Sequence, residues 1–328
     1  LGNYNEDMLR IGDSLGFHNR PGARFQKWVI DSFGFRGPEI TKAKPDSVVR
    51  VIVVGASESF GLGESPGMEY PAQMQRVLDS VAPGRYQVLN AACPGMTPPR
   101  IKYFFDNWLV QFDPDILVYY PSPSFYLDNQ PIPDSMNIAA INRWRPKHSL
   151  RIVDKARIML KRFIPHRLQT AIRKYLRERR QQKAQDGWVF TEIPQDRLKL
   201  FERHLRELIA DVKSHGVRVI IGTHGNRFGK VLSSEDEFHL ENGLHYNPRV
   251  TPEVALAFEP AANKLIENVA AADSCVLVDI ARRVPKGGEY FFDAGHFNDR
   301  GASLVAHLFA DAVLSEDSLR HPLTADIQ

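Results

Sequence analysis

The sequence contains little cysteine and no long apolar run. Only Cys93 and Cys275 occur among 328 residues, which excludes a scaffold built on disulfides. Neither cysteine has a second ligand-type residue at the spacing of a zinc site, so we predict no metal and no other cofactor. No apolar run approaches the roughly 20 residues that span a bilayer, and no signal-peptide pattern is present. We therefore expect no transmembrane segment.

The first residue is Leu1 rather than methionine. This leaves open a signal or anchor that has been removed, and with it a bacterial extracytoplasmic or membrane-associated location. Localisation is otherwise undetermined by the sequence.

The chain also lacks a strong charge of either sign. Its 42 Lys and Arg residues and 39 Asp and Glu residues give a net charge of +3, which is no nucleic-acid signature by itself. Hydrophobic residues make up 43% of the chain, which is ample for a packed core.

The most informative stretch runs from residue 50 to residue 63 and reads RVIVVGASESFGLG. Its β-branched run, 51–54, is typical of a strand buried on both faces of a parallel sheet. Gly55 ends that run, and the small residues that follow form a tight turn. This turn would leave the hydroxyl of Ser57 at the carboxyl edge of the sheet, where open α/β sheets bind ligands. Ser57 is thus a candidate nucleophile.

Strand and helix patterns alternate along the chain, which predicts right-handed crossovers and a parallel sheet. The predicted strands are 51–54, 87–90, 115–120, 217–222 and 275–280. The predicted helices are 68–81, 101–112, 197–215, 255–272 and 299–314.

These elements divide the chain into four parts. Residues 1–49 would form an N-terminal arm that packs on the core, with 34–38 as an ordered loop over the sheet edge. The core would comprise 50–120 and 197–315, followed by a tail at 316–328. Residues 121–196 would be a mainly helical insertion.

The insertion is strongly basic. Within 151–183, twelve Arg and Lys residues oppose only Asp154 and Glu178, and Pro165 should split the segment into two helices. One interpretation is a lid whose apolar side covers the sheet while its basic side is solvated. The other is an interface with an anionic surface, either a lipid, an acidic polymer or another protein. Nucleic acid is the weakest candidate, because no stacking platform accompanies the charge.

A second chemical pattern lies near the end of the chain in FFDAGHFNDRG. Asp293 and His296 are three residues apart in a loop before the last predicted helix. At that spacing a carboxylate can hold an imidazole and fix its tautomer, while the other ring nitrogen accepts the proton of a serine. Together with Ser57, the pattern predicts a catalytic pair on separate segments.

Gly12 to Leu15 spell GDSL, the tetrapeptide that names a hydrolase family, but this match is interpreted as coincidence. No buried strand precedes Ser14 and turn-forming residues follow it, so it lacks the strand-to-helix setting that exposes a nucleophile.

The serine turn at 55–61, the loop at 90–95 and the segment 293–296 with Gly301 resemble conserved blocks of the SGNH/GDSL hydrolase superfamily. The resemblance implies a flavodoxin-like three-layer α/β/α sandwich with a five-stranded parallel sheet. It also implies a triad of Ser57 as nucleophile, His296 as general base and Asp293 as its orienting acid.

The resemblance further implies three oxyanion donors. The backbone N–H groups of Ser57 and Gly95 match two of them. At the third, Ser124 stands where the family has asparagine, and a hydroxyl is shorter than an amide. Asn226 is a possible substitute, and His224 could contact substrate, although both equally suit ordinary loop capping.

Ala56 also departs from the family, which has an aspartate before the serine. This departure affects support of the loop more than the chemistry.

We therefore predict a serine esterase that acts on a small-molecule or glycan ester, with an O-acetyl or other short acyl group on a carbohydrate as the favoured substrate. Two alternatives remain open. One is an acyltransferase with the same triad, and the other is a binding protein that kept the fold and lost the activity.

Overall fold

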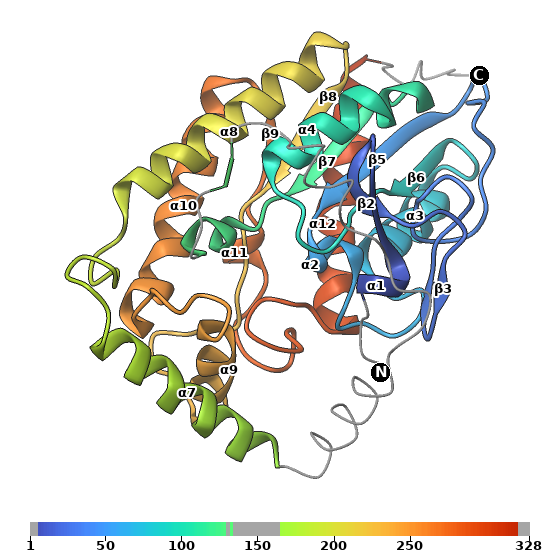
Figure 1. Ribbon diagram of the computed structural model, residues 1–328. Helices are drawn as coiled ribbons and strands as arrows, with labels where there is room; N and C mark the ends of the chain where they lie inside the picture. Colours follow the sequence, from blue (N-terminus) through green and yellow to red (C-terminus); the bar gives the residue numbers. More distant parts are fainter. Residues whose placement is uncertain (1–5, 129–131, 134–164, 321–328) are drawn as a thin grey trace.

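The structure is a computed structural model that describes residues 6–128, 132–133 and 165–320 (Figure 1). Its centre is one parallel five-stranded sheet with the order β6-β5-β7-β8-β9. The strands are β5 (Val49–Gly55), β6 (Tyr86–Asn90), β7 (Ile116–Tyr120), β8 (Arg218–Gly222) and β9 (Val276–Val278). The predicted five-stranded parallel sheet is confirmed.

The strand order places a switch point beside β5. The chain passes from β5 to β6 on one side and then returns to β7 on the other, so Val53 pairs with Asn90 of β6 and Gly55 pairs with Tyr120 of β7. This is the flavodoxin-like order, in which ligands bind outside the carboxyl ends of the strands at the switch. The turn that carries Ser57 follows β5 at that point.

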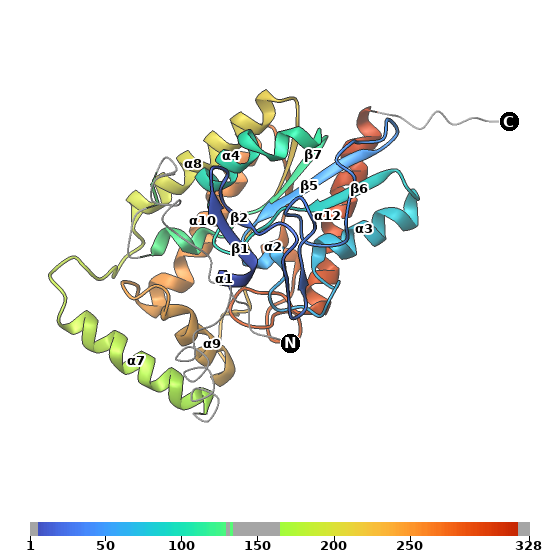
Figure 2. The ribbon, with the colours of Figure 1, turned by 45° about the vertical axis from the view of Figure 1, so that its right-hand side comes forward.

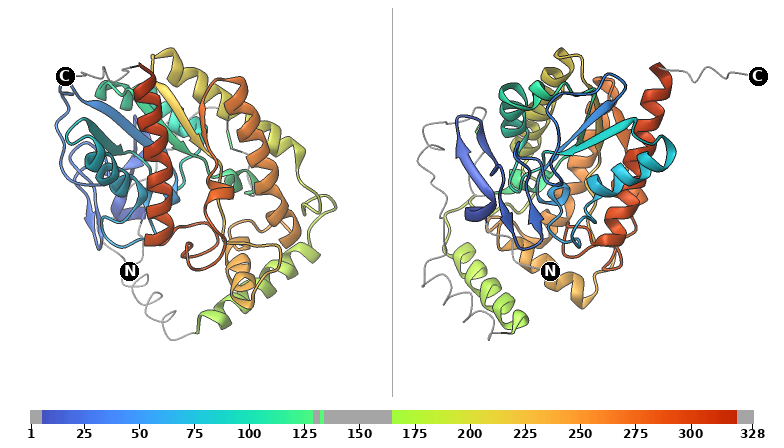
Figure 3. Two further views of the ribbon diagram at one scale, coloured as in Figure 1. Left: turned by 180° about the vertical axis from the view of Figure 1, so that it is seen from behind. Right: turned by 90° about the vertical axis from the view of Figure 1, so that its right-hand side faces the viewer.

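Helices cover both faces of the sheet, as the predicted three-layer sandwich requires. One face packs on α3 (Tyr70–Val81) and α12 (Asp299–Arg320), and α12 crosses it in the rear view of Figure 3. The other face packs on α4 (Pro98–Asn107), α8 (Gln195–Ser214) and α10 (Pro252–Ala272), grouped together in Figure 2. Alternate strand residues serve the two layers: Val51 and Val53 face α3 and α12, whereas Ile52 and Val54 face the other helices.

Several boundaries differ from the sequence prediction. The helix predicted at 101–112 begins at Pro98, and a separate 3₁₀ turn, η1 (Leu109–Phe112), replaces its end. The last strand is only three residues long, because Asp279 caps the short helix α11 (Ile280–Arg283) through its side chain. Helix α12 runs to Arg320 rather than ending at residue 314, so it extends into the predicted tail.

The N-terminal arm contains more regular structure than predicted. It holds a short helix, α1 (Glu6–Leu9), and two small antiparallel sheets, formed by β1 (Arg10–Asp13) with β2 (Gly16–Asn19) and by β3 (Arg24–Phe25) with β4 (Trp28–Val29). Strands this short have too few residues for an alternating pattern to be seen.

Two expectations for the arm hold. Ser14 lies in the exposed turn between β1 and β2 and not at a strand-to-helix turn. The loop at 34–38 covers the sheet edge, since the Arg36 N–H donates to the carbonyl of Asn90 at the end of edge strand β6 (2.8 Å).

The described parts of the insertion are η2 (Pro123–Leu127), which follows β7, and the helix α7 (His166–Gln182). Pro165 precedes α7 directly, as predicted for the second helix, while the first predicted helix lies outside the described residues. A further helix, α9 (Ser234–Leu244), was not predicted and lies between α7 and the rest of the molecule (Figure 1). Its sequence lacks a marked apolar stripe, but a Ser233–Asp236 capping box starts it. Throughout the described ranges, no helix has the length and apolarity needed to cross a bilayer.

Candidate active site

The strand-to-helix turn after β5 exposes one hydroxyl. Ser57 is the first residue of the short helix α2 (Ser57–Phe60) and is half-buried, whereas Ala56 and Ser59 on either side are buried. Ser59 is also engaged, because its Oγ accepts a hydrogen bond from Tyr70 Oη (2.8 Å). Ser57 is therefore the hydroxyl of this turn that a substrate can approach.

Gly55 makes the turn possible. A Cβ at this position would lie 2.3 Å from Ser59 Oγ and 2.9 Å from the carbonyl oxygen of Tyr120. Those distances are shorter than van der Waals contact, and the second atom is backbone that cannot rotate away. The close approach of β5, β7 and α2 thus requires glycine at residue 55.

Asp293 holds His296 by one ring nitrogen. The imidazole Nδ1 lies 2.8 Å from Asp293 Oδ2 and 2.9 Å from Oδ1, and Oδ1 also accepts the backbone N–H groups of Gly295 and His296. The contact expected from the three-residue spacing is thus present. It fixes Nδ1 as a proton donor and leaves Nε2 for other chemistry.

The charges around His296 favour its protonated form. Burial would lower its pKa, but the carboxylate of Asp293 and its hydrogen bond, followed by the charges of Glu58 and Glu64, raise it to about 9. Burial would raise the pKa of Asp293, and the charge and hydrogen bond of His296 instead hold it at about 2.

The hydroxyl and the imidazole are not hydrogen-bonded to each other. Nε2 of His296 is buried and has no partner among the described residues, while Ser57 Oγ donates to Glu58 Oε2 (3.3 Å). Such contacts are often loose before substrate binds.

The loop that follows α2 does pack on the segment that carries His296. The Ser65 N–H donates to Asp299 Oδ1 (2.6 Å), and a Cβ on Gly63 would lie only 2.3 Å from the carbonyl oxygen of Phe297.

Glu58 is a buried acid that the sequence analysis did not single out. Besides the Ser57 hydroxyl, its carboxylate accepts a hydrogen bond from Ser122 Oγ (2.9 Å) and lies 3.5 Å from His224 Nε2. Burial would raise its pKa, but the hydrogen bond from His224 and the charges of His296 and His224 lower it to about 2. Its one sequence signal was a charged residue in a turn of otherwise small side chains.

His224 lies on the far side of Glu58 from Ser57. Its ring is buried, stacks on Tyr120 (centroids 5.3 Å apart) and has Glu259 Oε2 3.5 Å from Nδ1. Burial would lower its pKa, yet Glu259 and Glu58 together raise it to about 10. The structure therefore places a buried charged pair behind the serine, and the substrate contact expected of His224 stays a prediction.

The remaining oxyanion candidates lie on loops at the same sheet edge. Gly95 has a positive φ of 83°, and its loop is tied to the end of β5 by the Cys93 N–H, which donates to the Gly55 carbonyl (3.2 Å). Ser124 lies half-buried in η2. Asn226 is already engaged, because its Nδ2 donates to Glu259 Oε2 (2.5 Å) and its Oδ1 accepts the N–H of Phe228.

A second unpredicted acid is Glu64, four residues beyond the end of α2. Its side chain is buried, and neither carboxylate oxygen has a hydrogen-bond partner among the described residues. Burial raises its pKa to about 8, against the smaller opposing effects of Arg36 and His296.

One group of metal-ligand side chains exists among the described residues, and it is not at this site. Ligand atoms of Asp106, Asp211 and His215 lie within 4.8 Å of one another. They come from the ends of α4 and α8, which lie at the amino edge of the sheet. Lys102 Nζ is 2.9 Å from a carboxylate oxygen of each aspartate, so both carboxylates already share one cation.

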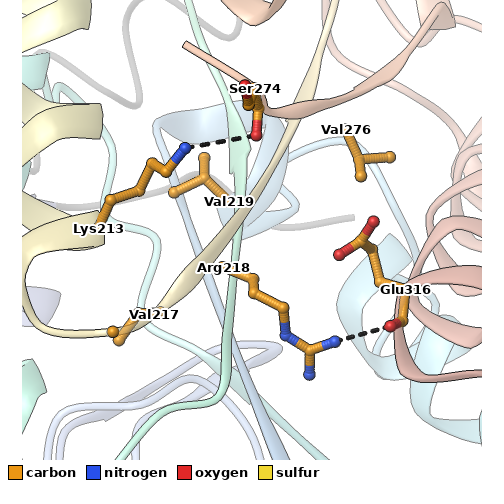
Figure 4. Close-up of a pocket in the computed structure, with 8 residues that line it drawn as sticks. Lys213, Val217, Arg218, Val219, Ser274, Val276 and Glu316 are labelled. Carbon is orange, nitrogen blue, oxygen red and sulfur yellow. Dashed lines mark hydrogen bonds between the residues drawn. The ribbon is translucent and has the colours of Figure 1, made fainter. Parts of the chain in front are cut away.

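A surface hollow also lies at the amino edge, around the start of β8 (Figure 4). Its cations are directed at backbone carbonyls: Lys213 Nζ donates to Ser274 and Arg218 Nη1 to Glu316 (3.4 and 2.9 Å). The hollow is therefore at the opposite end of the sheet from Ser57.

No family model and no curated protein matches the chain. Among solved structures, the acetyl xylan esterase AlAXEase is 14% identical with a TM-score of 0.46, over 81% of this chain and 100% of its own. Axe2, an acetylxylan esterase from Geobacillus stearothermophilus, is 13% identical with a TM-score of 0.47, over 81% and 94%. LAE5, an α/β hydrolase from the metagenome of Lake Arreo, is 14% identical with a TM-score of 0.47, over 80% and 94%. Likenesses of this degree carry no conclusion about the activity of this chain.

Proposed function

We propose that the protein is a serine esterase of SGNH type with Ser57 as nucleophile, His296 as general base and Asp293 as the acid that orients it. The observation that supports this most directly is the 2.8 Å contact between Asp293 and His296 Nδ1, which leaves a buried Nε2 without a partner. A histidine held in this way, in a loop packed on the one that follows an exposed serine, suits proton transfer from that serine.

In the reaction, Ser57 Oγ attacks the acyl carbonyl carbon while Nε2 of His296 takes the hydroxyl proton. The tetrahedral intermediate collapses, the C–O bond to the alcohol breaks, and His296 returns the proton to the leaving alcohol. Water then attacks the acyl-enzyme with the same base assistance, which releases the acid and restores the serine.

Before attack, the Ser57 hydroxyl must leave Glu58. A rotation about the Cα–Cβ bond moves Oγ from one staggered position to another without moving the backbone. The 3.3 Å bond to Glu58 is long for a hydroxyl donor, so its loss costs little. Glu58 itself is a poor base, because its pKa of about 2 leaves almost no affinity for the proton.

The oxyanion would be bound by the backbone N–H groups of Ser57 and Gly95, with Ser124 as the third donor. Ser124 is preferred over Asn226 because the Asn226 amide already donates to Glu259. The proposed substrate is a short acyl ester, such as an O-acetyl group on a carbohydrate. This part rests on the family resemblance of the motifs, since fold and triad do not fix the alcohol.

The test is covalent labelling of Ser57 by a fluorophosphonate, read by mass spectrometry of the tryptic peptide, together with hydrolysis of p-nitrophenyl acetate. Both should be lost in Ser57→Ala and reduced by at least about 10³-fold in His296→Ala, whereas Ser14→Ala, in the decoy tetrapeptide, should retain both. Folded wild-type protein that neither labels nor hydrolyses the ester would refute the proposal and favour a binding protein.

Hydrolysis and transfer are separated by a second measurement. An acetyl donor is supplied with and without a xylooligosaccharide acceptor, and released acetate is compared with acetylated glycan. Equal acetate release and no acetylated glycan supports the esterase, whereas acceptor-dependent acetylation identifies an acyltransferase.

A further inference from the structure

Helix α7 presents an exposed apolar stripe. Four large side chains lie on one side of the helix at spacings of four, three and one residues: Leu168, Ile172, Tyr175 and Leu176, which are 52%, 47%, 60% and 57% exposed. Scattered single apolar residues are normal on protein surfaces, but a contiguous group marks an interaction site. Positions i, i+4, i+7 and i+8 share a helix face, so these four side chains form one contiguous group. We refer to these four residues as the stripe.

Among the described residues, the stripe is not a core-facing surface that lacks its partner. The opposite side of α7 is already bound to α9 and the residues after it. Arg177 Nη2 donates to both oxygens of Glu241 (3.1 and 2.9 Å), Thr170 Oγ1 to Asn242 (2.9 Å), and Gln181 to the carbonyl of Pro248 (3.0 Å). These bonds fix the rotation of the helix, with the stripe directed away from α9. Among the described helices, α7 is the outermost on this side (Figures 1 and 3).

The charge of α7 suits an anionic partner. Between His166 and Gln182 the helix carries six Arg or Lys residues and a single acid, Glu178. Arg177 and Lys174 are paired with Glu241, and Arg180 lies over the ring of Trp188. Arg167 and Arg179 are exposed and form no ion pair with any described residue. The stripe is thus bordered by cations that the fold leaves available.

We propose that α7 docks on an anionic lipid surface, with the stripe in the headgroup region and Arg167 and Arg179 among the lipid phosphates. An apolar face combined with a basic border is the pattern of helices that lie in a membrane interface. A nucleic acid would use the charge but not four exposed apolar side chains, and an apolar protein partner would not need the cations.

The location of α7 gives this docking a consequence for the site. Helix α9, on which α7 packs, contacts the histidine loop: a Cβ on Gly243 would lie 4.0 Å from Ala294. Arg227 also connects α9 to this loop, since its side chain donates to Asp236 of α9 (2.7 Å) and its N–H donates to the Ala294 carbonyl (3.1 Å). A bilayer against the stripe is therefore connected to the loop that carries Asp293 and His296 through α7 and α9, without touching that loop.

The experiment is sedimentation of the full chain with vesicles of phosphatidylcholine alone or with 30% phosphatidylglycerol. We expect binding to the anionic vesicles only, weakened by high salt. The double variant Ile172→Gln with Tyr175→Gln should lose at least tenfold in partitioning, and Arg167→Gln with Arg179→Gln about tenfold or more. The matched control is Val81→Gln, another exposed apolar residue, 61% exposed at the end of α3, which should bind as the wild type does.

Circular dichroism and the labelling of Ser57 accompany each variant, because the docking does not depend on the esterase activity. Retained folding with lost sedimentation supports the proposal, whether or not the ester is hydrolysed. Equal binding to neutral and anionic vesicles, no binding to either, or wild-type binding by the stripe variant overturns it. Sedimentation velocity that shows a dimer lost only in the stripe variant would also overturn it, in favour of a second copy of the chain as the partner.

Discussion

Replacing Glu58 by glutamine should move the pH dependence of the proposed esterase activity. Glu58 is one of three carboxyl groups whose charge raises the pKa of His296, after Asp293 and before Glu64. Glutamine has nearly the same shape and can still accept hydrogen bonds from Ser57 and Ser122, but it carries no charge. The substitution therefore tests electrostatics with little change in packing.

The expected size of the shift follows from the protonation state of His296. Only neutral His296 can accept a proton, and with a pKa of about 9 roughly one molecule in a hundred is neutral at pH 7. An opposite charge close by typically contributes about 1–3 pKa units, and Glu58 ranks behind Asp293, so we expect its loss to lower the pKa of His296 by about 1. This would raise the neutral fraction at pH 7 about tenfold.

The assay is kcat/KM for p-nitrophenyl acetate between pH 6 and pH 10.5, because this quantity reports the pKa of the free enzyme. The kcat/KM of the wild type should rise with pH around an apparent pKa near 9, and that of Glu58→Gln around an apparent pKa about 1 unit lower. The matched control is Glu259→Gln, which removes an equal charge from the other side of His224 but is not among the groups that shift His296. Its pH profile should keep the wild-type midpoint.

Two results would refute this reasoning. One is an unchanged midpoint of the pH profile in Glu58→Gln, although the thermal unfolding midpoint shows that this variant is well folded. The other is an equal shift of the pH profile in Glu259→Gln. Either would mean that the charge of Glu58 does not act on His296.

Three further predictions concern the turn, a buried acid and the oxyanion donors. Glu64→Gln should stabilise the protein by on the order of 1–3 kcal/mol at pH 8 and little at pH 5 in urea unfolding. Because the pKa of Glu64 is raised to about 8 in the folded protein, this carboxyl costs stability once the pH rises above the ordinary pKa of a glutamate. The same stability difference between variant and wild type at pH 5 and pH 8 would contradict this. Gly55→Ala should destabilise by about 3 kcal/mol or more, measured in the same way, because its Cβ would meet the Tyr120 carbonyl at 2.9 Å; wild-type stability would show that the turn can relax. Ser124→Ala should lower kcat about 10²-fold with labelling of the serine retained, whereas an equal loss in Asn226→Ala alone would reassign the third donor.

The sheet could be predicted because its strands carry their own signal. Continuous β-branched runs such as 51–54, each bounded by turn residues, indicate a buried parallel strand whatever lies around them. The parallel direction of the strands followed from their alternation with helices. The short strands of the arm, the helix α9 and the end of α12 lacked such a signal.

The contacts of the site also differ in whether the local sequence predicts them. The contact of Asp293 with His296 was predictable because it depends on a local spacing of three residues. The contacts of Glu58 were not, because they join α2, η2 and the loop after β8, three segments that only the folded sheet brings together. Likewise, nothing in the sequence around Asn226 indicates that Glu259 engages its amide, since the two residues are 33 positions apart.

The order of the parts along the chain has a consequence for biosynthesis. Ser57 emerges from the ribosome early, whereas His296, its proposed base, follows much later, together with α12, the helix that covers one face of the sheet. The hydrogen bond from Ser65 to Asp299 joins the early segment to the late one. A nascent or truncated chain that stops before residue 290 thus carries the proposed nucleophile without its proposed proton acceptor, and a sheet with an open apolar face. In the proposed mechanism, esterase competence and burial of that face therefore depend on the same late segment of the chain.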